Sequence, residues 1–217
     1  MNEPPGFTEL TIGPLEPSHR SRVAEILQST ENFRDEEVDV ALELFDASFA
    51  GDEDYLLLGA FWGLGTRDWG LGRDASTRAE FSSAQEGSLP SPQSLVPAVQ
   101  SPVPSPLLAG FAIYGPTMGT DRTYDLYWIA VDRTAQGTGC GSVLLSEVER
   151  RLEALHARML VIETSSRSDY AATRTFYLRR GYVEAARVRE FYAPQDDRII
   201  LTKRLAGSPR EGWGAVA

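Results

Sequence analysis

The sequence predicts a single α/β domain, and the order of its apolar segments is the main reason. These segments follow one another as strand, two helices, three strands, helix, strand, helix and two strands. The 217 residues are enough for one sizeable α/β core. Contents of 42% hydrophobic and 24% charged residues are ordinary for a soluble globular protein.

The first half of the chain is expected to supply a strand, two helices and two further strands. The first strand covers residues 9–15, and Ser18 is expected to cap a helix that ends near residue 29. Residues 35–50 form the second helix, because their apolar residues recur at spacings of three and four and share one face. The residues that we expect this helix to bury are Val38, Leu42, Phe45 and Phe49. Apolar runs at 55–62 and 107–114 follow as strands.

The segment between those two strands, residues 63–106, has a different composition. Gly, Ser and Pro dominate it, with repeated Ser-Pro and Pro-x-Pro steps near its end. Such a segment cannot bury enough surface to offset the entropy lost on ordering, so we predict a disordered insertion in a β-hairpin. A tolerated surface insertion is the simpler interpretation, and a substrate lid or docking segment is the alternative. Residues 206–217 are expected to form a flexible tail.

The second half alternates strands and helices before a final hairpin. A strand at 123–131 leads into a helix at 142–156, and a strand at 158–164 leads into a helix at 170–180. Residues 182–192 and 198–204 are expected to form a hairpin around a turn at residues 194–197.

The turn after the strand that ends at Val131 is rich in small residues. Glycines at a helix start leave backbone N–H groups unpaired, and the helix dipole adds partial positive charge, so this turn predicts a phosphate or pyrophosphate site. A nucleoside-triphosphate loop would need Lys after its last Gly, but Gly141 is followed by Ser142. A dinucleotide loop fits Gly137 and Gly139 and lacks its third Gly; that alternative would make the chain a nicotinamide-dependent oxidoreductase.

Two motifs in this half of the chain point to coenzyme A instead. The first has the form Gln/Arg-x-x-Gly-x-Gly/Ala and consists of Gln136, Gly139 and Gly141. The second has the form Phe-Tyr-x-x-x-Gly-Phe, with Tyr in the last place, and consists of Phe176, Tyr177, Gly181 and Tyr182. In this order, the pair resembles the hallmarks of the GNAT superfamily of acyl-CoA N-acyltransferases. The resemblance covers roughly residues 7–205 and implies one GNAT-like domain with a mixed, largely antiparallel sheet flanked by helices.

The resemblance implies acetyl-CoA as cosubstrate and no metal. In the family, the strand before the first motif splays from its neighbour and bonds the pantetheine arm, a role that falls here on Ile129 and Val131. The pyrophosphate would lie on the N–H groups of Gln136, Gly137, Thr138, Gly139, Cys140, Gly141 and Ser142. Cys140 is also expected to serve in packing. Tyr170 departs from the family, because many relatives have Asn at this position.

Two side chains are the expected catalytic groups. Tyr177 stands where relatives carry a general acid that would assist departure of the coenzyme A thiolate. Since tyrosine has a pKa near 10 and a thiol near 8.5, full proton transfer costs only about 2 kcal/mol. Glu163 is the first candidate for the base, with Asp125 or a water chain as alternatives. Arg179 and Arg180 could contact the phosphates of the cofactor, but solvation is the preferred interpretation for both.

These assignments predict an N-acetyltransferase that moves an acetyl group from acetyl-CoA to a primary amine of a small molecule, peptide or protein by direct attack. The alternative is a non-catalytic coenzyme A-binding sensor or interaction module. A net charge of −10 argues against nucleic acid as partner. The longest nearly apolar run is shorter than the about 20 residues that cross a bilayer, and the single cysteine suits a reducing compartment, so we expect a cytoplasmic protein without a membrane partner, either monomer or homodimer.

Overall fold

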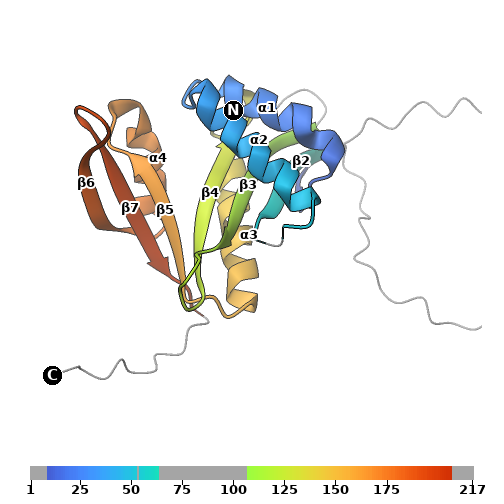
Figure 1. The fold of residues 1–217 in the computed structure, drawn as a ribbon. Coiled ribbons are helices and arrows are strands. Elements are labelled where there is room, and N and C mark those ends of the chain that lie inside the picture. Colours follow the sequence, from blue (N-terminus) through green and yellow to red (C-terminus); the bar gives the residue numbers. More distant parts are fainter. Residues whose placement is uncertain (1–8, 53, 64–106, 207–217) are drawn as a thin grey trace, which may run out of the picture.

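Seven strands form one mixed sheet in the computed structural model, which describes residues 9–52, 54–63 and 107–206 (Figure 1). Their order across the sheet is β1-β2-β3-β4-β5-β7-β6, and every neighbouring pair is antiparallel except β4 and β5. The strands are β1 (Glu9–Gly13), β2 (Leu56–Gly63), β3 (Leu107–Pro116), β4 (Thr123–Val131), β5 (Met159–Ser165), β6 (Val183–Ala193) and β7 (Asp196–Arg204). The predicted mixed, largely antiparallel α/β fold is confirmed.

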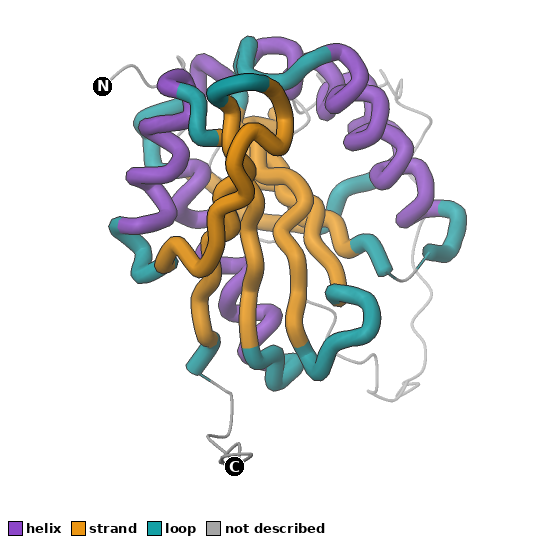
Figure 2. Tube along the Cα trace, turned by 60° about the vertical axis from the view of Figure 1, so that its left-hand side comes forward, coloured by secondary structure: helices purple, strands orange, loops and turns teal. Residues whose placement is uncertain are grey.

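Helices cover both faces of this sheet (Figures 1 and 2). In the described part of the chain they are α1 (Arg20–Ser29), α2 (Asp35–Phe49), α3 (Cys140–Ala154) and α4 (Ala171–Leu178). Short 3-10 turns precede three of them, namely η1 (Pro17–His19), η2 (Arg133–Ala135) and η3 (Ser168–Tyr170). None of these helices is long and apolar enough to cross a membrane.

Two hydrophobic clusters fill the space between sheet and helices. On one face, the apolar stripes of α1 and α2 pack around Phe45 and Phe111, which are 1% and 0% exposed. On the other face, α3 packs through Leu144 and Val148, and Tyr177 of α4 joins the same cluster. Strand β4 contributes side chains to both clusters, whereas the buried residues Leu160 and Ile162 of β5 belong to the α3 and α4 cluster alone.

Three details differ from the sequence prediction. Phe49 is 42% exposed, because it is the last residue of α2 and its ring packs beside that of Phe45 at 5.0 Å between centroids. The first helix begins at Arg20 instead of Ser18, since the 3-10 turn η1 comes first. Helix α3 begins at Cys140, because Gly139 ends the preceding turn with a φ of 95°.

The hairpin that carries the insertion is present. Strands β2 and β3 pair antiparallel from Leu56↔Tyr114 to Trp62↔Leu107. Gly63 is the last residue of β2, so the remainder of the predicted disordered insertion, 64–106, lies outside the described residues. The predicted tail lies outside them as well from residue 207 onward.

Candidate active site

The parallel ladder between β4 and β5 is short. It ends where Leu126 faces Ile162. Beyond this point β4 continues to Val131 beside β3, while β5 continues beside β7, and Figure 1 shows the two strands diverging. Among the described residues, the edge of β4 that faces β5 therefore has no strand partner over residues 127–131. This edge contains Ile129 and Val131, the two residues predicted to bond a pantetheine arm.

A β-bulge lies at the start of this open edge. Leu126 faces Tyr114 and Trp128 faces Ile113, which leaves Tyr127 as an extra residue in β4. A bulge locally redirects the backbone and side chains of its strand. Tyr127 is thereby left out of the regular ladder at the point where the strands separate.

The loop after β4 leaves backbone donors free. Gly137 and Gly139 have φ angles of 78° and 95°, a region that glycine enters without steric cost. In residues 9–52, 54–63 and 107–206, no hydrogen-bond acceptor is found for the backbone N–H groups of Gly137, Gly139, Cys140 and Gly141. The N–H groups of the other three predicted pyrophosphate-binding residues donate to loop carbonyls, at 3.4 Å for Gln136, 3.4 Å for Thr138 and 2.9 Å for Ser142. Four free donors at the start of α3 fit an anionic ligand.

Asp132 anchors the first turn of this loop. Its buried carboxylate accepts hydrogen bonds from the backbone N–H of Thr134 at 2.8 Å and from the Thr134 hydroxyl at 2.5 Å. Arg22 of α1 donates to the second carboxylate oxygen at 2.6 Å. Burial raises the pKa of Asp132, but the Thr134 hydrogen bonds and the charge of Arg22 outweigh it, so the pKa lies below its usual range.

We expect Asp132→Asn to lower the free energy of unfolding at pH 7 by about 1–3 kcal/mol, since it removes a charge that three hydrogen bonds satisfy. Because the folded-state pKa is depressed, this contribution is complete above the unfolded pKa of about 3.9 and is lost as pH falls through the folded value. Urea unfolding of both proteins at pH 7 and pH 3 measures it. An equal difference at both pH values would contradict this account.

The two sequence motifs meet in space. The guanidinium of Arg180 lies 3.7 Å from the centre of the Phe176 ring and donates a hydrogen bond to the hydroxyl of Ser142. A Cβ atom on Gly141 would lie 3.7 Å from the same ring. Arg180 is therefore half-buried against the glycine loop instead of facing solvent. It brings a positive charge beside the free N–H groups, so the preferred sequence prediction, solvation, is wrong for Arg180.

Cys140 is a packing residue in this loop. Its side chain is 1% exposed, and burial raises the pKa of the thiol to about 12. A Cβ atom at Gly110 of β3 would stand 3.1 Å from its sulfur. A thiol in such surroundings is protonated and inert at neutral pH.

Tyr177 is held in the core between the two motifs. It is 3% exposed, and its ring packs edge-on against Phe176 at 5.1 Å and Tyr182 at 5.5 Å. Burial raises the pKa of Tyr177, and the charge of Arg180 opposes this only in part. The phenol therefore stays neutral and keeps its proton at physiological pH.

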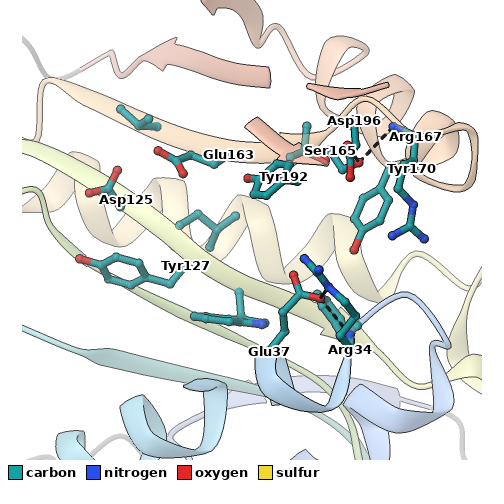
Figure 3. Close-up of a pocket in the computed structure, with 15 residues that line it drawn as sticks. Arg34, Glu37, Asp125, Tyr127, Glu163, Ser165, Arg167, Tyr170, Tyr192 and Asp196 are labelled. Carbon is teal, nitrogen blue, oxygen red and sulfur yellow. Dashed lines mark hydrogen bonds and ion pairs between the residues drawn. The ribbon is translucent and has the colours of Figure 1, made fainter. Parts of the chain in front are cut away.

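A cavity of about 330 Å³ opens beside the diverging strands (Figure 3). Its walls come from the α1–α2 turn, from β4 and β5, from the segment before α4 and from the β6–β7 turn. Both candidate bases, Glu163 and Asp125, line it. Glu163 forms an ion pair with Arg198 of β7, and Asp125 accepts a hydrogen bond from the Thr117 hydroxyl at 2.7 Å. Among the described residues, no cluster of three or more His, Cys, Asp or Glu side chains could hold a metal ion.

Tyr170 closes one end of the cavity. Its hydroxyl donates to the backbone carbonyl of Asn32, 138 positions away, at 2.8 Å. The bond ties the segment before α4 to the α1–α2 turn, and burial raises the pKa of Tyr170 to about 12. Where many relatives carry Asn, this chain thus uses a longer side chain to join the two sides of the cavity.

Comparison with known proteins agrees with these motifs. The model of the acetyltransferase (GNAT) domain matches residues 105–184. A solved structure from Desulfovibrio desulfuricans, assigned to the GNAT family of acetyltransferases, is 31% identical over 91% of this chain and 100% of that one, with a TM-score of 0.67. The chain belongs to the GNAT family. No curated protein matches it.

More distant solved structures share the fold with this GNAT protein. The ribosomal-protein-S18-alanine N-acetyltransferase of Escherichia coli is 20% identical, with 94% of this chain and 99% of that chain covered and a TM-score of 0.59. The Salmonella typhimurium protein yncA, solved with its cofactor acetyl-CoA, is 15% identical, with 91% and 95% covered and a TM-score of 0.57. Family membership supports N-acetyltransferase activity in general terms.

Proposed function

We propose that this GNAT protein transfers the acetyl group of acetyl-CoA to a primary amine by direct attack. The observation that carries the proposal is the meeting of three features where β4 and β5 diverge. The loop with four free N–H groups lies at one end of the open β4 edge, the cavity lined by both candidate bases lies beside it, and Tyr177 belongs to the motif that packs against the loop. The cytoplasmic location and the 7–205 domain boundaries remain predictions.

The chain offers acetyl-CoA two sets of backbone groups. Free N–H groups at the start of α3, assisted by Arg180, suit its pyrophosphate, and the open edge with Ile129 and Val131 suits its pantetheine amides. When bound, acetyl-CoA supplies the thioester carbonyl that the amine attacks. The bulge at Tyr127 leaves backbone N–H groups of β4 available to the carbonyl oxygen as negative charge develops on it.

In the proposed reaction a C–N bond forms, the C–S bond breaks and the amine loses one proton. Glu163 takes this proton directly or through water, at the expense of its ion pair with Arg198. Tyr177 assists the leaving thiolate. Because burial raises its pKa, complete proton transfer costs more than the about 2 kcal/mol expected for an ordinary tyrosine. Its proposed role is therefore to donate a hydrogen bond to the sulfur.

The two candidate bases can be separated with matched variants. We expect Glu163→Gln to lower kcat/KM by about 10²-fold or more and to flatten the acidic limb of its pH profile, because the variant cannot accept a proton. Asp125→Asn, a matched change in the same cavity, should alter kcat/KM by less than about fivefold. A third variant, Arg198→Met, removes the ion pair with Glu163 and keeps the Glu163 carboxylate. Nearly normal rates in both carboxylate variants would assign proton removal to water alone.

Binding and transfer assays test the proposal itself. Acetyl-CoA at 100 times its Kd should stabilise the protein by about 2.7 kcal/mol, seen as a thermal shift that NAD does not produce. Thiol release in the presence of an amine panel then measures transfer. Binding without transfer to any amine would favour the sensor alternative, and a shift with NAD instead of acetyl-CoA would favour the oxidoreductase alternative.

A further inference from the structure

We propose that the amine acceptor is a small molecule with a second cationic group, which binds to Asp196 while the reacting amine lies where β4 and β5 diverge. The inference rests on the proposed function and names the class of its acceptor. It starts from the balance of charges around the cavity. Four carboxylates and two guanidinium groups line it, namely Glu37, Asp125, Glu163, Asp196, Arg34 and Arg167.

Most of these charges are already paired. The pairs are Arg34 with Glu37, Arg167 with Asp169, and Glu163 with Arg198. Asp125 and Asp196 differ, because in the described part of the chain their hydrogen-bonding side-chain partners are the neutral hydroxyls of Thr117 and Ser165. Neither carboxylate forms an ion pair with a described residue, although the charge of Asp196 contributes to the raised pKa of Arg167, whose own ion-pair partner is Asp169.

Of the two carboxylates, Asp196 gives the stronger indication of a bound cation. It is the first residue of β7 and is 8% exposed, and its carboxylate accepts one hydrogen bond, from the Ser165 hydroxyl at 2.5 Å. A carboxylate so removed from water is costly unless a positive charge or several donors satisfy it. An ammonium group offers the three donors that such oxygens lack.

The position of Asp196 separates its partner from the reacting nitrogen. Figure 3 shows Asp196 and Ser165 toward one end of the cavity and Asp125 toward the other, with Glu163 nearer Asp125. The Tyr192 ring lies between the two ends and the Tyr127 ring lies at the Asp125 end, and both suit an apolar spacer (Figure 3). About 330 Å³ is near the lower limit for ligand pockets. A short α,ω-diamine matches this sequence of cation, apolar spacer and cation.

A series of acceptors of equal length tests the inference without any substitution. The compounds are 1,5-diaminopentane, 5-aminopentan-1-ol, pentylamine and 5-aminopentanoate, each assayed for kcat/KM with saturating acetyl-CoA. We expect the diamine to exceed the amino alcohol by about tenfold or more, beyond the advantage of two reactive ends, because a charged hydrogen bond replaces a neutral one. The amino acid should be the poorest acceptor. Equal kcat/KM values for diamine, alcohol and alkylamine would overturn the inference.

Two variants locate the second cation. Asp196→Asn should reduce kcat/KM for the diamine about tenfold more than for the amino alcohol, whereas Ser165→Ala, which keeps the carboxylate, should preserve the preference. A preference that survives Asp196→Asn would overturn the assignment to Asp196. A dipeptide amide with N-terminal Ala and a second-position Lys offers the same two charges on a peptide, and a higher kcat/KM for it than for the diamine would overturn the small-molecule class.

The outcomes also separate this inference from the proposed function. Transfer to pentylamine without a preference for charged acceptors would support the acetyltransferase activity and contradict the proposed dicationic acceptor. Binding of acetyl-CoA without transfer to any compound of the series or of the wider amine panel would contradict the proposed acetyltransferase activity itself.

Discussion

Replacing Tyr177 by Phe is expected to lower kcat by about 10²-fold or more while the Kd for acetyl-CoA changes by less than about threefold. The variant keeps the ring that packs against Phe176 and Tyr182 and loses the hydroxyl that would stabilise the leaving sulfur. Single-turnover rates and calorimetric Kd values measure the two effects separately. Because burial raises the pKa of Tyr177, its proton should be retained throughout the assay range, so this group should produce no alkaline decline in the wild-type rate.

Tyr182→Phe is the matched control for this prediction. Tyr182 lies in the same core, but its hydroxyl donates to Glu149 at 2.9 Å and plays no part in the proposed reaction. The control should lose about 1 kcal/mol of stability and keep its kcat. Equal losses of kcat in both variants would show that packing, not the Tyr177 hydroxyl, is what matters.

Gly139→Val should weaken acetyl-CoA binding by about 10²-fold. Gly139 has a φ of 95°, where a β-branched residue is strained by roughly 1–3 kcal/mol, so the backbone is expected to rotate and move its neighbours' N–H groups. Each charged hydrogen bond lost costs about 1.5 kcal/mol or more. Calorimetric titration with acetyl-CoA measures the loss of affinity.

Gly51 provides a control with the same backbone strain. Its φ is 96°, it follows α2, and, as at Gly139, an added Cβ atom would meet nothing within 4 Å. Gly51→Val should lower the melting temperature about as much as Gly139→Val and leave the Kd for acetyl-CoA unchanged. A comparable loss of affinity in both variants would mean that general destabilisation, not the loop, weakens binding.

The sequence was informative where local chemistry decides the structure. The glycine loop and the second motif could be recognised because both depend on residues a few positions apart, and the fold class that they implied is confirmed. The catalytic roles of Tyr177 and Glu163 and the binding roles of the loop residues remain predictions. Glu163 lines the cavity beside the diverging strands, and the loop residues present free N–H groups at the start of α3, whereas Tyr177 is buried in the core and is not among the residues that line the cavity.

Other features depend on packing between distant segments and could not be predicted. The hydrogen bond from Tyr170 to Asn32 spans 138 positions. The sequence showed that a tyrosine at this position departs from the family, but it did not identify Asn32 as the partner. Asp196 falls in a predicted turn, where a carboxylate is normally solvated, and only the fold of Ser165 against it buries the side chain. Arg180 faces the loop because α4 is short and ends against it.

The short parallel ladder also divides the molecule into two cooperative units. One chain break between α3 and β5 would separate β1 to β4 with their three helices from β5 to β7 with α4. Four backbone pairs, the core cluster around Tyr177 and a few side-chain hydrogen bonds, such as Tyr170 to Asn32 and Arg180 to Ser142, join these units, whereas antiparallel ladders hold each one internally. Partial opening should therefore begin along this seam. A ligand that contacts both units would hold them together, so binding of the cosubstrate would stabilise the protein as well as support its chemistry.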